Sequence, residues 1–420
     1  MQRQSRSVSP MLVDLHAHYP MHLYPEARTR VGRRLRRSRG IFRLVRQQQA
    51  WFRALLVGLA SLFINYRSIF SGPRVRMSYL REGDVGVALS VLYSFFDEVD
   101  VIDGVVPKRH YIDALIEQMD VVEDNIADHH ADVAEVTPNP EKLAAARGAG
   151  KTAVVHCVEG GFHLGGDADQ VRTAVGRLAE RGVAYITLAH LIWRDVATDA
   201  PALPFMSDAQ YRKWLPQPDD GLSPLGEAAV REMHRRRVLI DLSHMSERSL
   251  GDTFDLLDEL DPGHTTPVFA THAGYRFGTQ EYMLATPTIE RIKERDGVVG
   301  LIFAQHQLYD GLVEGPQSPA DPPRPRLPKP SSFEDSVSVL REHIDRIREI
   351  TGSHRHTAIG SDLDGFIKPT LPHLEDMRDM APLQQALRAA YGDEDAELIC
   401  EANGMRLLME HWGGGPGRPG

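Results

Sequence analysis

Hydrophobic and polar positions along the chain alternate between short apolar runs and longer amphipathic stretches. The apolar runs are sharply bounded by polar residues, which is typical of β-strands covered on both faces. Helical periodicity fills stretches between them, among them Tyr111–His129, Asp167–Arg181 and Pro224–Arg237. The eight apolar runs are Met11–Leu15, Val85–Tyr93, Thr152–Val158, Ala184–Leu188, Val238–Leu242, Val268–Thr271, Val298–Phe303 and Thr357–Ser361. This alternation predicts an α/β fold, and eight β/α units favour a (β/α)8 TIM barrel over a doubly wound sheet.

Two segments interrupt this pattern, and we expect both to be additions to one barrel spanning residues 1–412. Residues 26–75, after the first strand, contain ten arginines between Arg28 and Arg53, with apolar residues at helical spacing behind them. The apolar part, residues 54–64, is too short to span a bilayer. We favour a helical insertion that covers the barrel mouth, and membrane or partner contact through residues 28–64 is left open. Residues 315–332, after the seventh strand, are proline-rich and predict a loop, and residues 413–420 predict a disordered tail.

Composition narrows the class of protein. Charged residues make up 25% of the 420 residues and the formal net charge is −10, which fits a globular enzyme and disfavours a nucleic-acid partner. Cys157 and Cys400 are the only cysteines, and the first fifteen residues lack the apolar core of a signal peptide. We therefore expect a cytoplasmic protein that acts on a small molecule, and a homodimer is left open.

Residues of the metal-ligand type follow six of the predicted strands. In strand order they are His16 and His18, Glu159, His190, His244, His272 and Asp362. In a barrel the carboxyl ends of all strands meet at one rim, so these side chains should share one site. Nitrogen and oxygen ligands without a thiolate suit Zn²⁺, or another divalent ion such as Mn²⁺ or Fe²⁺.

The spacing of these ligands predicts two divalent ions, with zinc favoured. His16 and His18 stand two residues apart on an extended segment, so both imidazoles point the same way and can hold one ion together with Glu159. Glu159, His244 and His272 can hold the second ion. A bridging Glu159 would keep the two ions about 3.5 Å apart with a shared water between them. The competing interpretation is that these residues are unrelated to one another. It requires that ligand-type residues follow six different strands by chance.

Several motifs carry a family resemblance. The segments VEGG, YITLAH, LSPLGEAAVREMHRRRVLIDLSHMS, PVFATHAG and IGSDLDGF resemble the membrane (renal-type) dipeptidases, the M19 zinc peptidases of the amidohydrolase superfamily. The resemblance implies that Glu159 bridges the metals and that His244 and His272 bind the second zinc. It also implies that His190 faces the substrate carbonyl and that Asp362 transfers the proton, with Asp364 behind it.

The chain departs from the family pattern in three places. The family has His-x-Asp after the first strand, where this chain has His16-x-His18. The family also has an arginine after the strand-six histidine, where this chain has Tyr282-Met283-Leu284-Ala285. The nearest arginine is Arg276, so we take Tyr275, Arg276 and His190 as candidate substrate-binding residues. The arginine-rich insertion is the third departure.

The ligand set predicts amide hydrolysis by a hydroxide that bridges two metal ions, and the resemblance implies a dipeptide substrate with a C-terminal D-residue tolerated. Asp362 would accept the proton of the water and pass it to the leaving amine, and His190 would stabilise the oxyanion. One alternative is another amidohydrolase reaction, on an N-acyl amino acid, a lactone or a cyclic amide. A second is a non-catalytic barrel that binds membrane or a partner through the basic insertion, which the intact ligand set disfavours.

Overall fold

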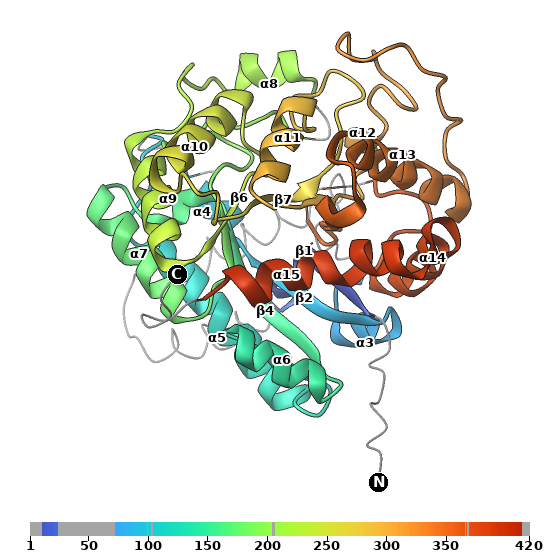
Figure 1. Ribbon diagram of the computed structural model, residues 1–420. Coiled ribbons are helices and arrows are strands. Elements are labelled where there is room, and N and C mark those ends of the chain that lie inside the picture. The colour runs from blue at the N-terminus through green and yellow to red at the C-terminus, as the bar shows by residue number, and fades with distance from the viewer. Residues whose placement is uncertain are drawn as a thin grey trace.

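The structure is a computed structural model of the whole chain (Figure 1). It describes residues 11–23, 72–98, 100–101, 104–203, 206–365, 367 and 369–413. Most of the arginine-rich insertion and of the glycine-rich tail therefore lie outside the described residues. The predictions of a helical lid, of membrane contact through residues 28–64 and of a disordered tail stay predictions.

Eight parallel strands close into a barrel, as the alternation of the sequence predicts. The strands are β1 (Leu12–Ala17), β2 (Val85–Leu92), β4 (Thr152–Glu159), β5 (Tyr185–Thr187), β6 (Leu239–Asp241), β7 (Val268–Ala273), β8 (Val299–Leu301) and β9 (Thr357–Ile359). Neighbours in the sheet follow the order β2-β1-β9-β8-β7-β6-β5-β4, and the pairing of β2 with β4 closes the ring. The (β/α)8 prediction is confirmed.

A further strand, β3 (Ala134–Val136), was not predicted. It pairs in parallel with the first residues of β4, from Ala134 opposite Thr152 to Val136 opposite Val154. With three residues, one of them the charged Glu135, it carries no apolar run long enough to be recognised in the sequence. Its pairing with β4 identifies it, and only the tertiary structure supplies that pairing.

Helices surround the barrel on its outer face (Figure 1). They are α3 (Met77–Glu82), α4 (Phe95–Glu98), α5 (Tyr111–His129), α6 (Pro140–Gly148), α7 (Ala168–Glu180), α8 (Asp208–Trp214), α9 (Pro224–Arg236), α10 (Glu247–Leu260), α11 (Thr286–Glu294), α12 (Gln305–Leu308), α13 (Phe333–Thr351), α14 (Met380–Glu397) and α15 (Asn403–Arg406). Polar caps set several starts: the side chains of Asp167, Ser223 and Ser246 accept backbone N–H groups in the first turns of α7, α9 and α10. The proline-rich residues 315–332 contain no helix or strand, as predicted.

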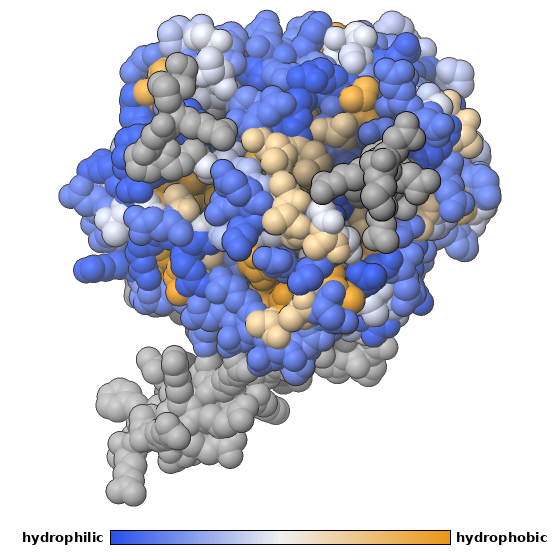
Figure 2. Space-filling model, turned by 60° about the horizontal axis from the view of Figure 1, so that its bottom comes forward, coloured by the Kyte–Doolittle hydropathy of each residue, from blue (hydrophilic) through white to orange (hydrophobic). Residues whose placement is uncertain are grey.

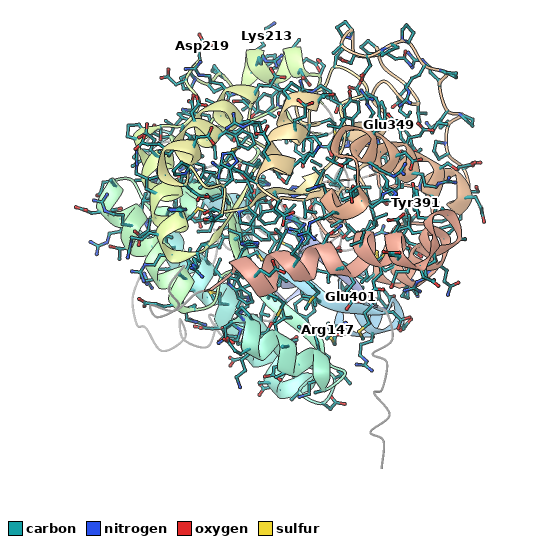
Figure 3. All side chains as sticks on the ribbon, in the orientation of Figure 1. Arg147, Lys213, Asp219, Glu349, Tyr391 and Glu401 are labelled. Atoms are coloured by element: carbon teal, nitrogen blue, oxygen red, sulfur yellow. The ribbon has the colours of Figure 1, made fainter. Side chains whose placement is uncertain are left out.

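The C-terminal helical segment closes the end of the barrel where the strands begin. Asn403 in α15 donates two hydrogen bonds of 2.8 Å to the carbonyl oxygens of His354 and Thr357, at the start of β9. Arg147 of α6 pairs with Glu401 of the π-helical segment Leu398–Ala402, and both are labelled in Figure 3. Because helices cover this end of the barrel, we expect the functional residues at the opposite rim, where the strands end.

The face of the molecule shown in Figure 2 is largely hydrophilic, with a group of hydrophobic residues near its middle. Large hydrophobic side chains stand exposed at five described positions: Val101, Val105, Val106, Trp214 and Met409. Among the helices that the structure describes, none combines the length and the apolar character needed to traverse a bilayer. The cytoplasmic location stays a prediction.

Candidate metal centre

The rim where the strands end gathers seven side chains into one buried group, here called the histidine–carboxylate cluster. Its members are His16, His18, Glu159, His190, His244, His272 and Asp362. Each is at most 7% exposed. All seven were predicted from the sequence, and the structure brings them together although they come from six different strand ends.

Glu159, the last residue of β4, lies at the centre of this cluster. Its Oε1 atom is 3.2 Å from His16 Nε2 and 3.5 Å from the Nε2 atoms of both His244 and His272. Its Oε2 atom is 3.5 Å from His18 Nε2 and 3.3 Å from His190 Nε2. Five imidazoles thus face one carboxylate, in agreement with a bridging position for Glu159.

Burial and neighbouring charge act in opposite directions on Glu159. Burial alone would raise the pKa of its carboxyl, but the His190 and His16 imidazoles outweigh burial and hold that pKa well below its usual range. His272 behaves differently: burial, together with the neighbouring imidazoles of His16 and His244, lowers its pKa well below the ordinary value. The cluster therefore offers an ionised carboxylate and a neutral imidazole, the protonation states that metal binding needs.

The cluster fits divalent metal ions on its own geometry. His16 Nε2 and Glu159 Oε2 are buried and make ion-pair contacts but no hydrogen bond among the described residues, so both atoms can serve as metal ligands. His244 Nε2 and His272 Nε2 face each other at 2.9 Å, so two lone pairs converge unless a cation or a proton lies between them. Two ligands of a tetrahedral zinc ion, each bonded at about 2.0–2.1 Å, lie about 3.3 Å apart, close to the separations seen around Glu159.

Three ligand triads have donor atoms within 4.8 Å of one another: His16, His18 and Glu159; His16, His272 and Asp362; and Glu159, His190 and His244. The first is the predicted first metal site. For the predicted second site, Glu159 and His244 share a triad, while His272 is joined to them by the 3.5 Å and 2.9 Å contacts described above.

Hydrogen bonds behind the cluster orient two of the imidazoles. The Thr271 hydroxyl donates to Asp241 at 2.7 Å, so its oxygen accepts from Nδ1 of His272, also at 2.7 Å. The Tyr185 hydroxyl donates to a backbone carbonyl of β1, so its oxygen accepts from Nδ1 of His16 at 2.9 Å. In both rings Nδ1 thus faces an oxygen behind the cluster and Nε2 faces the cluster, the ring orientation that a metal ligand requires.

Glu98, the last residue of α4, holds His190 and was missed by sequence reasoning. Its Oε2 accepts from His190 Nδ1 at 2.8 Å and from the Tyr93 hydroxyl, and its Oε1 accepts the backbone N–H groups of Leu191 and Ile192 at 2.7 and 3.1 Å. Burial opposes its charge, but His190 and these donors lower its pKa. The sequence did contain a signal for Glu98. It follows the second predicted strand, and the second and seventh strands were the two to whose ends no metal ligand was assigned.

Asp362 lies beside the histidines of β1 and has a strained backbone. Its Oδ1 is 3.0 Å from His18 Nε2 and 3.8 Å from His16 Nε2. Its φ is +54°, and that of His244 is +67°, both in the left-handed region that non-glycine residues rarely occupy. Strain of this kind collects at functional sites because the surrounding structure holds the side chain where chemistry needs it.

Two further buried carboxyl groups support this loop without entering the cluster. Asp364 accepts the backbone N–H groups of Arg74 and Val75, each at 2.9 Å, and burial raises its pKa to about 6. Asp14 accepts the backbone N–H and the hydroxyl of Ser361 at 2.9 and 2.5 Å. The expectation that Asp364 lies behind Asp362 agrees with these contacts.

A narrow pocket of about 10 Å³ opens against the cluster. His18, Glu159, His190, His244 and Asp362 line one part of it. The remaining wall, here called the opposite wall, consists of Leu191, Ala202, Tyr282, Ile302, Gln307 and Ile367.

Tyr275 and Arg276, predicted to bind substrate, do not line this pocket. The Tyr275 hydroxyl donates to Asp321 of the proline-rich loop at 2.5 Å. The Arg276 guanidinium pairs with Glu247 and donates to two backbone carbonyls of its own loop, each at 2.7 Å. Both side chains therefore stabilise the loop after β7, and their assignment to substrate binding stays a prediction. Tyr282 of the same loop reaches the pocket instead.

Comparison with known proteins identifies the family. The family model described as membrane dipeptidase, peptidase family M19, matches residues 57–411. This chain belongs to the M19 family. The match begins after His16 and His18, so the departure at these two positions lies outside it.

Individual M19 relatives and similar folds agree with this assignment. An uncharacterized dipeptidase of Schizosaccharomyces pombe, C965.12, is 27% identical over 301 residues, which cover 68% of this chain and 60% of that protein. The chain thus spans about three fifths of the length of this relative. Two crystal structures share the fold with a TM-score of 0.65 at 18% identity: dipeptidase AC, a metallopeptidase, and a metallopeptidase from Rhodobacter sphaeroides liganded with a phosphinate mimic of L-Ala-D-Ala. The alignment covers 97% of this chain and 100% of dipeptidase AC, and 96% of this chain and 99% of the R. sphaeroides protein.

Proposed function

We propose that this protein hydrolyses the amide bond of a dipeptide with two divalent metal ions, zinc being favoured. One observation carries the proposal: a single carboxylate, Glu159, stands 3.2–3.5 Å from five imidazole nitrogens at the rim where the barrel strands end. Membership of the dipeptidase family supports the reaction. The dipeptide mimic bound by the R. sphaeroides relative supports the substrate class and the tolerance of a C-terminal D-residue.

His16, His18 and Glu159 would hold one ion, and Glu159, His244 and His272 the other. When bound, such ions lower the pKa of a coordinated water towards neutrality and polarise a carbonyl oxygen. The ligand set contains no thiolate, which is consistent with a site for hydrolysis.

Protons are handled by residues of the chain. Asp362, whose Oδ1 lies 3.0 Å from His18 Nε2, would accept a proton from the attacking water and return it to the leaving amine. Glu98 accepts from His190 Nδ1, which turns the Nε2 side of that ring towards the pocket. A proton on Nε2 can then be donated to the oxygen on which negative charge develops.

The test is hydrolysis of matched L,L and L,D dipeptides by protein loaded with zinc, with a chelated sample as the control. We expect metal-dependent cleavage and about two equivalents of bound metal per chain. Protein that retains two ions but cleaves no dipeptide would contradict the proposal.

A second candidate is another amidohydrolase reaction, on an N-acyl amino acid, a lactone or a cyclic amide. The observation that favours it is the composition of the pocket, since none of the described lining residues is an arginine or lysine that could bind a substrate carboxylate. The same panel, extended by an N-acyl amino acid and a lactone, separates the two reactions. Membrane contact through residues 28–64 stays a separate proposal, tested by liposome co-sedimentation with and without residues 26–70.

A further inference from the structure

The opposite wall of the pocket contains one side-chain amide in an apolar setting. Gln307 lies in α12, a few residues after the end of β8, and is 3% exposed. Its Oε1 atom is buried and has no hydrogen-bond partner among the described residues. A buried polar atom without a partner is destabilising, so its presence at the wall of a pocket points to a ligand group that completes the bond.

The surroundings of Gln307 restrict which ligand group this is. Leu191, Ala202, Ile302 and Ile367 are apolar, and the Tyr282 hydroxyl already donates to the carbonyl oxygen of His272 at 2.8 Å. No described residue of the opposite wall carries a charge. A charged end of a substrate would lose its water there without gaining a counter-charge, which is costly.

The residue next to Gln307 does not change this conclusion. His306 is absent from the pocket lining, and burial lowers its pKa to about 4, so its imidazole is neutral near pH 7. Among the described residues that line the pocket, the charged groups are therefore those of the histidine–carboxylate cluster on the other side. Among the described side chains of the opposite wall, the polar atom without a hydrogen-bond partner is Gln307 Oε1.

We propose that Gln307 is a specificity-determining residue whose buried, unpartnered amide at the apolar wall hydrogen-bonds an uncharged amide of the substrate. The preferred substrate would then be a dipeptide in which the end facing this wall is blocked, rather than a free dipeptide with two charged ends. A primary amide or an N-acyl amide is uncharged and has an N–H group for Gln307 Oε1, whereas a carboxylate has no N–H group and an ammonium would bring a charge to this apolar wall. This inference rests on the proposed function and names the substrate class of the same site.

The test compares three substrates with the zinc-loaded protein: Ala-Ala, Ala-Ala-amide and N-acetyl-Ala-Ala. We expect one of the two blocked forms to have a higher kcat/KM than Ala-Ala. Gln307→Leu, which keeps the size and removes the amide, should lower kcat/KM for that blocked form by roughly threefold to tenfold, the range for one neutral hydrogen bond. Its effect on Ala-Ala should be smaller.

Gln305→Leu is the matched control, because Gln305 belongs to the same helix but its side chain donates to the Thr370 carbonyl oxygen at 2.9 Å, outside the pocket. It should leave the ratio between substrates unchanged. Metal content and thermal unfolding identify a variant that fails to fold, and Gln307→Asn, with a shorter amide, then replaces Gln307→Leu. The inference is overturned if Ala-Ala is the best substrate, or if Gln307→Leu changes all three substrates equally. Cleavage of none of them by protein holding two ions would instead contradict the proposed function.

Discussion

Replacing Glu98 by glutamine tests whether the carboxylate behind His190 contributes to turnover. Glu98 is fully buried and its Oε2 accepts from His190 Nδ1 at 2.8 Å, while Oε1 accepts from the backbone N–H groups of Leu191 and Ile192. In Glu98→Gln the side-chain oxygen can keep the two backbone donors. The new NH₂ group then faces the N–H of His190, so one donor opposes another.

The expected magnitude follows from the bond that is lost. A hydrogen bond to a charged group contributes about 1.5–3 kcal/mol, and about 1.4 kcal/mol corresponds to a tenfold change. If this bond keeps the His190 ring in the orientation that stabilises the transition state, kcat should fall by roughly 10- to 150-fold when the bond is lost. Glu98 is absent from the pocket lining, so KM should change much less.

The assay measures kcat, KM and bound metal for wild type, Glu98→Gln and Tyr93→Phe on one dipeptide. Tyr93→Phe is the control, because it removes another donor to Glu98 and leaves the His190 contact in place. We expect a large decrease in kcat only for Glu98→Gln, with the metal content unchanged in both variants. A kcat within about threefold of wild type for a folded, metal-loaded Glu98→Gln would refute the positioning role.

Three further predictions concern the proton acceptor, the metals and a buried histidine. Asp362→Asn should retain both ions but lower kcat by about 10²–10⁴-fold, and near wild-type turnover would contradict its assignment. Chelation should abolish activity and lower the midpoint of thermal unfolding, since an ion present at 100 times its Kd stabilises the fold by about 2.7 kcal/mol; an unchanged midpoint would argue against a metal centre. His343 is buried between the Tyr275 N–H and the Leu308 carbonyl, and burial lowers its pKa from 6.5 to about 4. As the pH falls, the unfolded chain therefore binds a proton on this imidazole at a higher pH than the folded protein does. The contribution of neutral His343 to the free energy of unfolding is fully present above pH 6.5 and decreases by up to about 3 kcal/mol as the pH falls towards 4. Urea unfolding of chelated wild type and His343→Leu between pH 7.5 and 4.5 measures this, and equal pH dependence in both proteins would count against it.

The strand pattern of the sequence predicted the barrel because buried parallel strands are recognisable one at a time. Each apolar run needs only its own residues to be seen, and α5 was predicted at its observed bounds, Tyr111–His129. Strand ends were less certain: His16 and His272 belong to β1 and β7, although both were expected to follow their strands. Three-residue β3 had no such signal and became visible only through its partner.

The contacts that tune the site could not be predicted in the same way. Glu98 and His190 are 92 residues apart, and nothing near either residue in the sequence predicts the bond between them. Arg276 was chosen because it is an arginine close to the strand-six histidine, but the fold of its loop directs the guanidinium to Glu247 and to backbone carbonyls. Tyr282 and Gln307 became candidates only when the loops after β7 and β8 were seen to form one wall.

The sequence by itself therefore determined the barrel and the membership of the histidine–carboxylate cluster. The physical reason is that a barrel brings the carboxyl ends of all its strands to one rim, so ligands placed at strand ends must meet wherever the loops go. The tertiary structure alone decided which carboxylate orients His190 and which side chains form the opposite wall. Those outcomes depend on how the connecting loops pack against one another, and loop packing is set by contacts between residues that are distant in the chain.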